Sequence, residues 1–187
     1  MNNIKEEILK SSRELFTDYG YRKVTMDEIA KASGVTKKTV YSYFKDKESL
    51  LKSLVEEEME KMKKIITKHS VINNNNFFEE VNKTLYDLLK YKKEAKLFVT
   101  LSKEANELKS ISSKNSIEMI DSTILSFIKE KLVYAINKGY IKKCDPDLCA
   151  FIIYKVYVAV MYEWDKEIDE KEVTQNVTQI LKEGLFN

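Results

Sequence analysis

The chain has 187 residues, of which 43% are hydrophobic and 33% are charged, as in a soluble globular protein. It contains four glycines and one proline, so few turns are available and long helices with short connections are expected. The net charge of +2 by itself neither supports nor excludes a nucleic-acid partner, and the absence of an apolar run after a basic start argues against a signal peptide and for a cytoplasmic location.

The first predicted helix covers about residues 3–19 and ends at Gly20. Its inward face is expected to consist of four apolar residues, Ile4, Ile8, Leu15 and Phe16. The surplus of positive charge lies in this part of the chain, because residues 1–48 hold ten Lys and Arg against eight Asp and Glu. Such a distribution favours attraction to phosphates near the amino terminus.

Two short capped helices follow. Thr25 and Glu28 have the spacing of a capping box, which predicts a helix that starts at Met26. Gly34 suits the left-handed conformation that ends such a helix, and Thr36 is placed to cap the next one. Two capped helices around a glycine turn are typical of a DNA-reading element.

The second of these helices has an inner and an outer face. Val40 and Phe44 are four residues apart, so they share a face that should pack on the core. The opposite face and its flanks carry lysines, hydroxyls and tyrosines, which can bond to base edges or phosphates. The alternative interpretation is a helical hairpin whose lysines are simply solvated.

We expect two groups of DNA contacts. The residues predicted to face base edges are Lys37, Lys38, Thr39 and Ser42. The residues predicted to hold phosphates are Thr25, Tyr41, Tyr43 and Lys47.

Residues 8–54 contain Ile8, Leu15, Phe16 and the segments YGYRKVTMDEIAKASGV (19–35), TKKTVYSYF (36–44) and KDKESLL (45–51). In these residues the chain resembles the tetracycline-repressor (TetR) family of bacterial transcription regulators. Ser12 departs from the family, which usually has Ala at this position. The resemblance implies a homodimeric repressor that binds a palindromic operator in double-stranded DNA and releases it when a small-molecule effector binds.

The fold is predicted to be all-α, with two domains. Residues 1–46 should form a three-helix DNA-binding domain with a helix-turn-helix, and residues 47–187 a helical effector-binding and dimerisation domain. Asp46 should cap the long helix that connects them. The apolar positions of that helix are Leu50, Leu51, Leu54, Val55, Met59, Met62, Ile65 and Ile66.

The central helices are separated by polar segments. Residues 73–76 are four asparagines and should break the chain, and residues 112–116 are interpreted as a loop and cap. A helix is expected after the first break, a shorter one over about residues 94–108, and a long one that is closed by Gly139. The apolar stripe of the helix after the asparagines comprises Phe78, Val81, Leu85, Leu88 and Leu89. The apolar stripe of the long helix comprises Ile117, Ile120, Ile124, Phe127, Ile128, Leu132 and Ala135.

Asp145 and Pro146 predict the start of another helix. Residues 148–164 are apolar nearly all round, but the run is shorter than the about 20 residues of a membrane span and Lys155 interrupts it. We therefore expect no membrane insertion and a helix covered on two sides, by its own core and by a second subunit. The last predicted helix, about residues 170–185, has a stripe of Val173, Val177, Ile180, Leu181 and Gly184, and the family resemblance implies that these two helices dimerise. The alternative is that both are core helices of a monomer.

Aromatic residues in the body of the chain are candidates for an effector site. Tyrosine combines apolar surface with a hydroxyl, which suits a mainly hydrophobic small molecule, although such residues are more often core. The predicted ligand-binding residues are Tyr86, Phe98, Phe127, Tyr154 and Tyr157. Lys155, Glu163 and Asp165 are the candidates for buried charged groups in the apolar helices.

The sequence contains no pattern that predicts catalysis, a metal site or a cofactor. Cys144 and Cys149 are the only cysteines, and the single histidine, His69, has no partner at zinc-ligand spacing. The thiols are interpreted as buried or incidental, with a redox switch as the alternative. Because a G-x-S-x-G motif and a glycine-rich phosphate loop are also absent, an enzyme is not expected. A helical protein-interaction module without regulated DNA binding is the alternative function.

Overall fold

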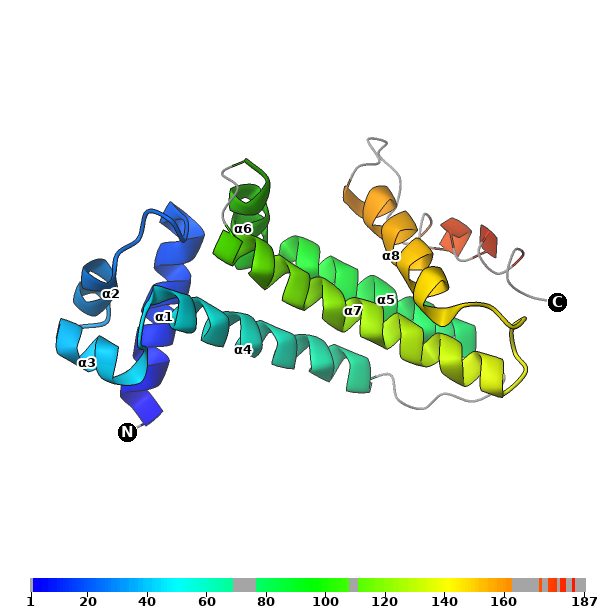
Figure 1. The fold of residues 1–187 in the computed structure, drawn as a ribbon, viewed down its shortest axis with the longest axis horizontal. Coiled ribbons are helices and arrows are strands. Elements are labelled where there is room, and N and C mark those ends of the chain that lie inside the picture. Colours follow the sequence, from blue (N-terminus) through cyan, green and yellow to red (C-terminus); the bar gives the residue numbers. More distant parts are fainter. Residues whose placement is uncertain are drawn as a thin grey trace. The chain divides into compact units, whose positions relative to one another are not determined.

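The computed structural model describes residues 2–68, 77–107 and 111–162, together with residues 172, 175–177, 179–180 and 183. No strand occurs among these residues, and the all-α prediction is confirmed. Figure 1 shows the helices in chain order. Their bounds are α1 (Asn2–Tyr19), α2 (Met26–Ala32), α3 (Lys37–Tyr43), α4 (Lys47–Lys68), α5 (Phe77–Glu94), α6 (Lys96–Glu107), α7 (Ile111–Asn137) and α8 (Pro146–Tyr162).

The chain forms two compact units. The first contains Met1–Lys61 and Lys92–Ile120, and the second contains Met62–Tyr91 and Asp121–Asn187. The first unit therefore joins α6 and the start of α7 to the three amino-terminal helices, because α6 packs against α1. This grouping differs from the predicted division between residues 46 and 47, which stays a prediction about functional domains.

Helix α1 runs through the first unit and contributes to its core. Ile8 and Phe16 are fully buried, and Gly20 ends the helix with a φ of +87°. The prediction that Ile4 faces inward is wrong, because it is 41% exposed in the first turn, which extends beyond the helices beside it (Figure 1). Ser12 is fully buried, and its hydroxyl donates to the Ile8 carbonyl at 2.6 Å. The serine therefore leaves no unsatisfied polar group in the packing of α1.

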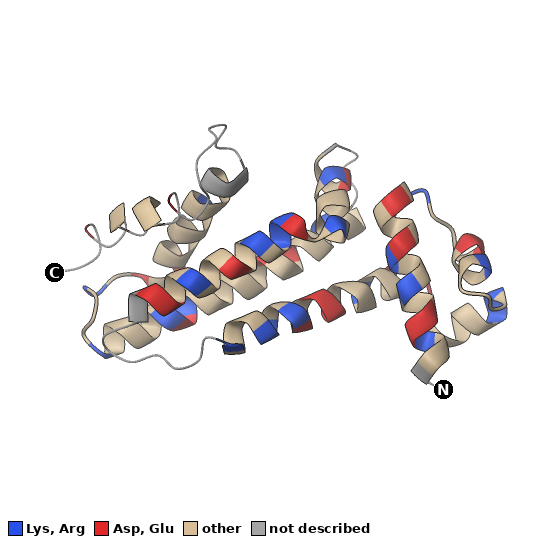
Figure 2. Cartoon of the chain, turned by 180° about the vertical axis from the view of Figure 1, so that it is seen from behind, with Lys and Arg blue, Asp and Glu red and all other residues tan. Residues whose placement is uncertain are grey.

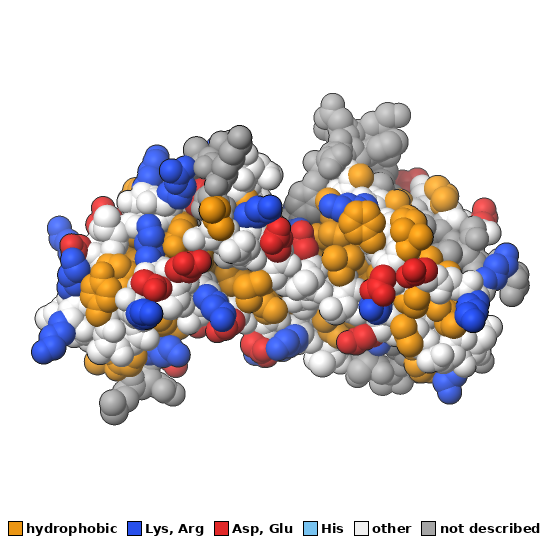
Figure 3. All heavy atoms as spheres, in the orientation of Figure 1, with side chains coloured by type: hydrophobic (Ala, Val, Ile, Leu, Met, Phe, Trp, Pro, Cys, Tyr) orange, Lys and Arg blue, Asp and Glu red, His pale blue; other side chains and the backbone are white. Residues whose placement is uncertain are grey.

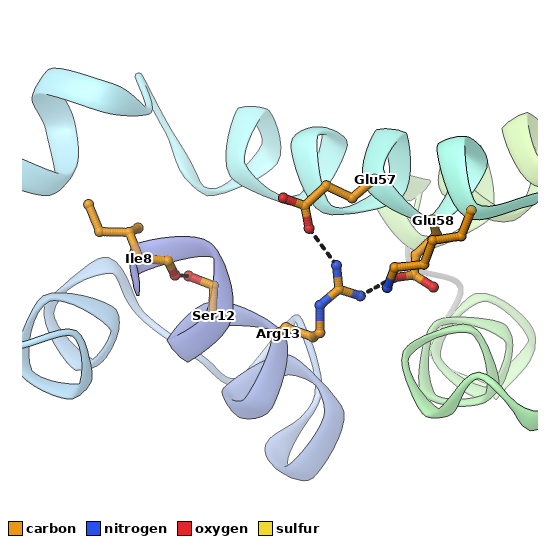
Figure 4. Close-up of polar contacts among 6 residues, drawn as sticks. Ile8, Ser12, Arg13, Glu57 and Glu58 are labelled. Atoms are coloured by element: carbon orange, nitrogen blue, oxygen red, sulfur yellow. Dashed lines mark hydrogen bonds and ion pairs between the residues drawn. The ribbon is translucent and has the colours of Figure 1, made fainter. Parts of the chain in front are cut away.

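A charged cluster joins α1 to α4. The Arg13 guanidinium lies between Glu57 and Glu58 of α4 and forms an ion pair with each (Figure 4). The Glu57 pair spans 2.7 Å and is partly exposed, whereas the Glu58 side chain is only 3% exposed and also pairs with Lys61 at 2.7 Å. A buried carboxylate needs such partners, since an unpaired one would carry a large desolvation cost.

Most of the first unit's core is apolar and comes from α1, α2, α3, α4, α6, α7 and the segment between α1 and α2. Its apolar members include Leu9, Tyr21, Val24, Met26, Ile29, Ala30, Val40, Phe44, Leu50, Leu51, Leu54, Val55, Leu97, Phe98, Leu101 and Ile120.

The second unit is built from the end of α4, from parts of α5 and α7, which run side by side in both views, and from α8 (Figures 1 and 2). Gly139 ends α7 with a φ of +72°, and Asp145 caps α8 by accepting from the Asp147 and Leu148 amides at 2.9 and 3.1 Å. Both features confirm the predicted ends. Its buried apolar residues include Met62, Leu85, Leu88, Leu89, Ile124, Phe127, Ile128, Leu132, Ala135, Ala150, Tyr154, Tyr157 and Val177.

The prediction of a loop and cap at residues 112–116 is wrong, because α7 begins at Ile111 and continues through them. Serine disfavours helix interiors when its hydroxyl competes for backbone groups. Here Ser113 and Ser116 are buried, and their hydroxyls donate to Glu104 Oε2 at 2.9 Å and to the Ser112 carbonyl at 2.8 Å. These partners make a serine-rich helix start compatible with burial.

Some predicted features lie outside the described residues. They include the break at residues 73–76, the side chain of Phe78, and Glu163, Trp164, Asp165, Val173, Leu181 and Gly184. In the described remainder of the last predicted helix, Val177 is buried and Ile180 is 69% exposed. No helix in the described part of the chain is both long and apolar enough to span a membrane.

Candidate nucleic-acid interface

Helix α2 begins where the capping box predicts. The Glu28 amide donates to Thr25 Oγ1 at 3.3 Å, and the Thr25 amide donates to Glu28 Oε2 at 2.7 Å. The bonds from Thr25 hold the pKa of the Glu28 carboxyl below its ordinary value, since they favour the charged form. Thr25 thus acts as a helix cap, and its phosphate contact stays a prediction.

Helix α3 is set on the core as predicted. Thr36 caps it by accepting from the Thr39 amide at 3.1 Å, and Gly34 makes the preceding turn with a φ of +66°. Val40 is fully buried and Phe44 is nearly so. These two anchors determine which side chains of α3 can face outward.

The outward face of α3 is polar. Its exposed residues are Lys37, Lys38, Tyr41 and Ser42, while Thr39 and Tyr43 are half-buried at its edges. The Ser42 hydroxyl donates to the Thr39 carbonyl at 2.7 Å, so its oxygen faces outward as an acceptor. The structure thus brings six of the eight predicted DNA contacts together on one short helix, and their contacts with DNA stay predictions.

Two lysines of this helix differ in their surroundings. Lys37 Nζ lies 2.9 Å from Asp27 Oδ1 of α2, and the hydrogen bond to Asp27 raises the pKa of Lys37. Lys38 is exposed, and within the described part of the chain no carboxylate pairs with it. Figure 2 shows both signs of charge on α2, whereas the charged residues of α3 are lysines. Lys38 is therefore the better placed of the two to reach a base or a phosphate.

Lys47 has a structural role in addition to its predicted one. Its ammonium donates to the carbonyls of Tyr21 at 2.8 Å and Val24 at 2.7 Å, with Arg22 at 3.3 Å, and lies 4.5 Å from the centre of the Tyr21 ring. Partial burial lowers its pKa. Because an ammonium has three donors, a phosphate contact would require it to give up a carbonyl, and that contact stays a prediction.

Sequence reasoning missed two acidic residues at this site. Asp27 could have been noticed as an acidic residue in the first turn of α2, ten positions before Lys37. Glu104 gave no signal, since it accepts from the Arg22 amide at 3.1 Å across a separation of 82 residues. Asp27 neutralises the charge of one lysine of the interface, Lys37. Glu104 contacts the segment that precedes α2.

The predicted effector residues fall in both units. Phe98 is buried in the first unit, whereas Tyr86, Phe127, Tyr154 and Tyr157 belong to the second. Phe127, Tyr154 and Tyr157 are buried, and Tyr86 is half-buried. The Tyr157 hydroxyl donates to Asn82 Oδ1. Their contact with a ligand stays a prediction. Among the described residues there is no group of three or more His, Cys, Asp or Glu that could hold a metal ion.

Comparison with known proteins agrees with this geometry. Residues 8–54 match the family described as bacterial regulatory proteins, tetR family. The chain is 33% identical over 163 residues to the uncharacterized HTH-type transcriptional regulator YhgD of Bacillus subtilis, which covers 87% of this chain and 85% of that one. It is 29% identical over 68 residues, 36% of each chain, to the HTH-type transcriptional repressor Rv1474c of Mycobacterium tuberculosis.

The fold is also that of a solved regulator. AibR in complex with isovaleryl coenzyme A and operator DNA superposes with a TM-score of 0.64 at 21% identity, over 95% of this chain and 97% of that one. This likeness shows a shared fold.

The pair between Lys37 and Asp27 generates a prediction. Asp27→Asn should increase affinity for duplex DNA about threefold to tenfold at low salt, because it removes a negative charge beside the interface and leaves Lys37 without an ionic partner. Fluorescence anisotropy over a range of salt concentrations measures this. Asp18→Asn, the same charge change at an exposed position of α1, is the control and should change affinity by no more than about twofold. Equal effects of the two variants would contradict a specific role for Asp27.

Proposed function

Because the chain belongs to the TetR family of bacterial regulatory proteins, we propose that it is a homodimeric repressor that binds a palindromic operator and releases it when a small molecule binds. The family is one of helix-turn-helix transcription regulators, not of enzymes. The repressing direction is supported by the relative Rv1474c, which is named a repressor.

The outward face of α3 carries the proposal. Its polar side chains stand opposite the two buried anchors, Val40 and Phe44, so the helix can enter a major groove without disturbing the core. In this arrangement Lys37, Lys38, Thr39 and Ser42 face base edges. Thr25, Tyr41, Tyr43 and Lys47 lie toward the phosphates, with Lys47 limited by its carbonyl partners.

Lys38 provides the test of base reading. Lys38→Ala should weaken binding by about 1–3 kcal/mol at one preferred base pair and less at others, if its ammonium donates to a guanine. The measurement is anisotropy on a duplex selected from a random library with the unmutated protein, and on its single-base variants. Lys31→Ala, an exposed lysine of α2, is the control and should affect all duplexes alike. A uniform loss for Lys38→Ala would make it a phosphate contact, and failure of the unmutated protein to select any duplex would contradict the proposed function.

Helix α8 supports the dimer. Leu148, Phe151 and Ile152 are 56%, 51% and 46% exposed, and their spacing places them on one stripe. The opposite side of the same helix buries Tyr154 and Tyr157. Figure 3 shows hydrophobic side chains exposed over α8. An apolar stripe of this kind on a helix that is already packed on its other side suits an interface with a second copy of the chain.

The dimer predicts the effect of a charge on that stripe. Phe151→Glu should give monomers, because burying a carboxylate at the interface would carry a desolvation cost that the neighbouring Lys155 only partly offsets, and operator affinity should fall with the lost second half-site. Sedimentation equilibrium measures the mass. Val99→Glu, the same kind of change at a 53% exposed position of α6, should leave the dimer intact. A concentration-independent monomer for the unmutated protein would contradict the dimer.

The effector site is proposed in the second unit. Tyr86, Phe127, Tyr154 and Tyr157 supply aromatic surface there, and the Tyr157–Asn82 hydrogen bond adds a polar group. Lys90 and Lys131 lie 5.9 and 5.6 Å from the rings of Tyr86 and Phe127. Aromatic surface beside cations suits an amphipathic molecule with an acidic end. The structure of AibR with isovaleryl coenzyme A makes that compound a reasonable first probe.

Effector binding and operator binding should weaken each other, because coupling between two sites is reciprocal. A compound that releases operator should bind about 5 to 150 times more weakly when operator is present, because coupling of about 1–3 kcal/mol acts in both directions. Titration with isovaleryl coenzyme A, followed by the fluorescence of the single tryptophan, Trp164, with and without operator, measures both affinities. Trp164 itself lies outside the described residues. Equal affinities would show that the compound is not an inducer.

A further inference from the structure

Residues 20–24 connect α1 to α2 and determine where the helix-turn-helix begins. Helix α2 packs on both α1 and α3, so a shift at its start would move the outward face of α3. Tyr21 and Val24 are buried in this segment, and the Tyr21 ring packs edge to face on Phe16, 5.2 Å away. The segment is therefore a part of the core.

One buried carboxylate joins this segment to two further helices. Glu104 of α6 is only 5% exposed, and its Oε1 accepts from the Arg22 amide at 3.1 Å. Its Oε2 accepts from the hydroxyl of Ser113 of α7 at 2.9 Å, and Ser113 is fully buried. The two oxygens of a single side chain thus bond in different directions, one to the segment before α2 and one to α7.

Gly20 makes this approach possible. A Cβ at this position would lie 2.6 Å from Glu104 Oε1 and 3.5 Å from its Cδ, so the carboxylate occupies the space that any other residue would fill. A second contact between α6 and α1 lies nearby, where the Thr100 hydroxyl donates to the Thr17 carbonyl at 3.2 Å. Glu104 is thus built into a close contact between α6 and the end of α1.

Burial of a carboxylate does not by itself favour stability. An apolar side chain of similar volume avoids the desolvation cost, and such replacements are often neutral or stabilising. What a carboxylate adds is direction, because its hydrogen bonds are satisfied only when the 20–24 segment, α6 and α7 keep one arrangement. This directional requirement is suited to positioning.

We propose that Glu104 is a positioning residue for DNA binding, whose carboxylate attaches residues 20–24, and with them the helix-turn-helix, to α6 and α7. The inference rests on the proposed function and adds its means of regulation. A displacement of α6 or α7 separates the carboxylate from the Arg22 amide or moves the segment with it. In either case the position of the start of α2 changes.

The test compares Glu104→Ala with Glu104→Gln in the full chain. The alanine removes the acceptor, so hydrogen exchange at the Arg22 amide should become about tenfold faster and operator affinity should fall about tenfold. Glutamine keeps an acceptor oxygen and should restore both to within about threefold of the unmutated protein. Circular dichroism confirms folding, and exchange at buried backbone amides elsewhere in the first unit is the internal reference. A general loss of stability would accelerate exchange at those amides as well, whereas loss of the Glu104 acceptor should act at Arg22.

Gly20 gives an independent variant if Glu104→Ala does not fold. Gly20→Ala should push the carboxylate away and increase exchange at Arg22 and weaken operator binding, each about tenfold. Gly139→Ala is the matched control, because Gly139 has a similar φ of +72° but no atom within 4 Å of the added Cβ. It carries the same kind of backbone strain and should change neither quantity.

The outcomes separate this inference from the proposed function. Unchanged Arg22 exchange or unchanged operator affinity in folded Glu104→Ala would overturn the positioning role, as would equal effects of Gly20→Ala and Gly139→Ala. Failure of the unmutated protein to bind any selected duplex would instead overturn the proposed function. The exchange at Arg22 would then still decide whether Glu104 holds the segment.

Discussion

The segment of residues 20–24 is held by opposite charges, and the position of the DNA-binding helices depends on it. The Lys47 ammonium donates hydrogen bonds to the carbonyls of Tyr21 and Val24, while the Glu104 carboxylate accepts one from the Arg22 amide. A peptide segment offers both kinds of group, so a cation and an anion can each find partners there without competing. The attraction between the two side chains also helps Lys47 to remain charged despite its partial burial. Their combined effect is to fix the start of α2 from α4 and from α6.

The features that could be predicted from the sequence are those whose partners lie within a few residues. The Thr25–Glu28 box, the Thr36 cap and the left-handed Gly34 are all local, and the structure has each of them. The loop predicted at residues 112–116 failed for the opposite reason. Serine propensity is local, but the partner of the Ser113 hydroxyl is Glu104 on another helix. The same limit hid Glu104, because nothing near it in the chain indicates that its acceptor is needed 82 positions away.

Lysines near the helix-turn-helix show why charge counting gives only part of an interface. The sequence pattern predicts that Lys37 and Lys38 face base edges and that Lys47 holds a phosphate, but it does not distinguish the surroundings of the three ammonium groups. In the structure Lys37 is paired with Asp27, Lys47 is engaged with backbone carbonyls, and Lys38 is exposed. To contact DNA, Lys37 would have to give up its ion pair and Lys47 a hydrogen bond to a carbonyl, so the free-energy cost of binding is lowest for Lys38. Composition indicates where the interface lies, but the surroundings of each ammonium decide which one is available to DNA.

The grouping of α6 with the amino-terminal helices changes how regulation should be understood. A boundary between residues 46 and 47 would leave α4 as the main connection between the two predicted domains. The Glu58 carboxylate of α4 forms an ion pair with Arg13 of α1. In the structure the first compact unit also includes α6 and the start of α7, which contact the same unit through Glu104, Ser113 and Thr100. Because α7 continues from Ile120 into the second unit at Asp121, a movement that begins among the aromatic residues there has a covalent route into the unit that carries α3. Signal transmission from the proposed effector site then requires no separate hinge before α4, since the start of α7 is already part of the unit that carries the helix-turn-helix.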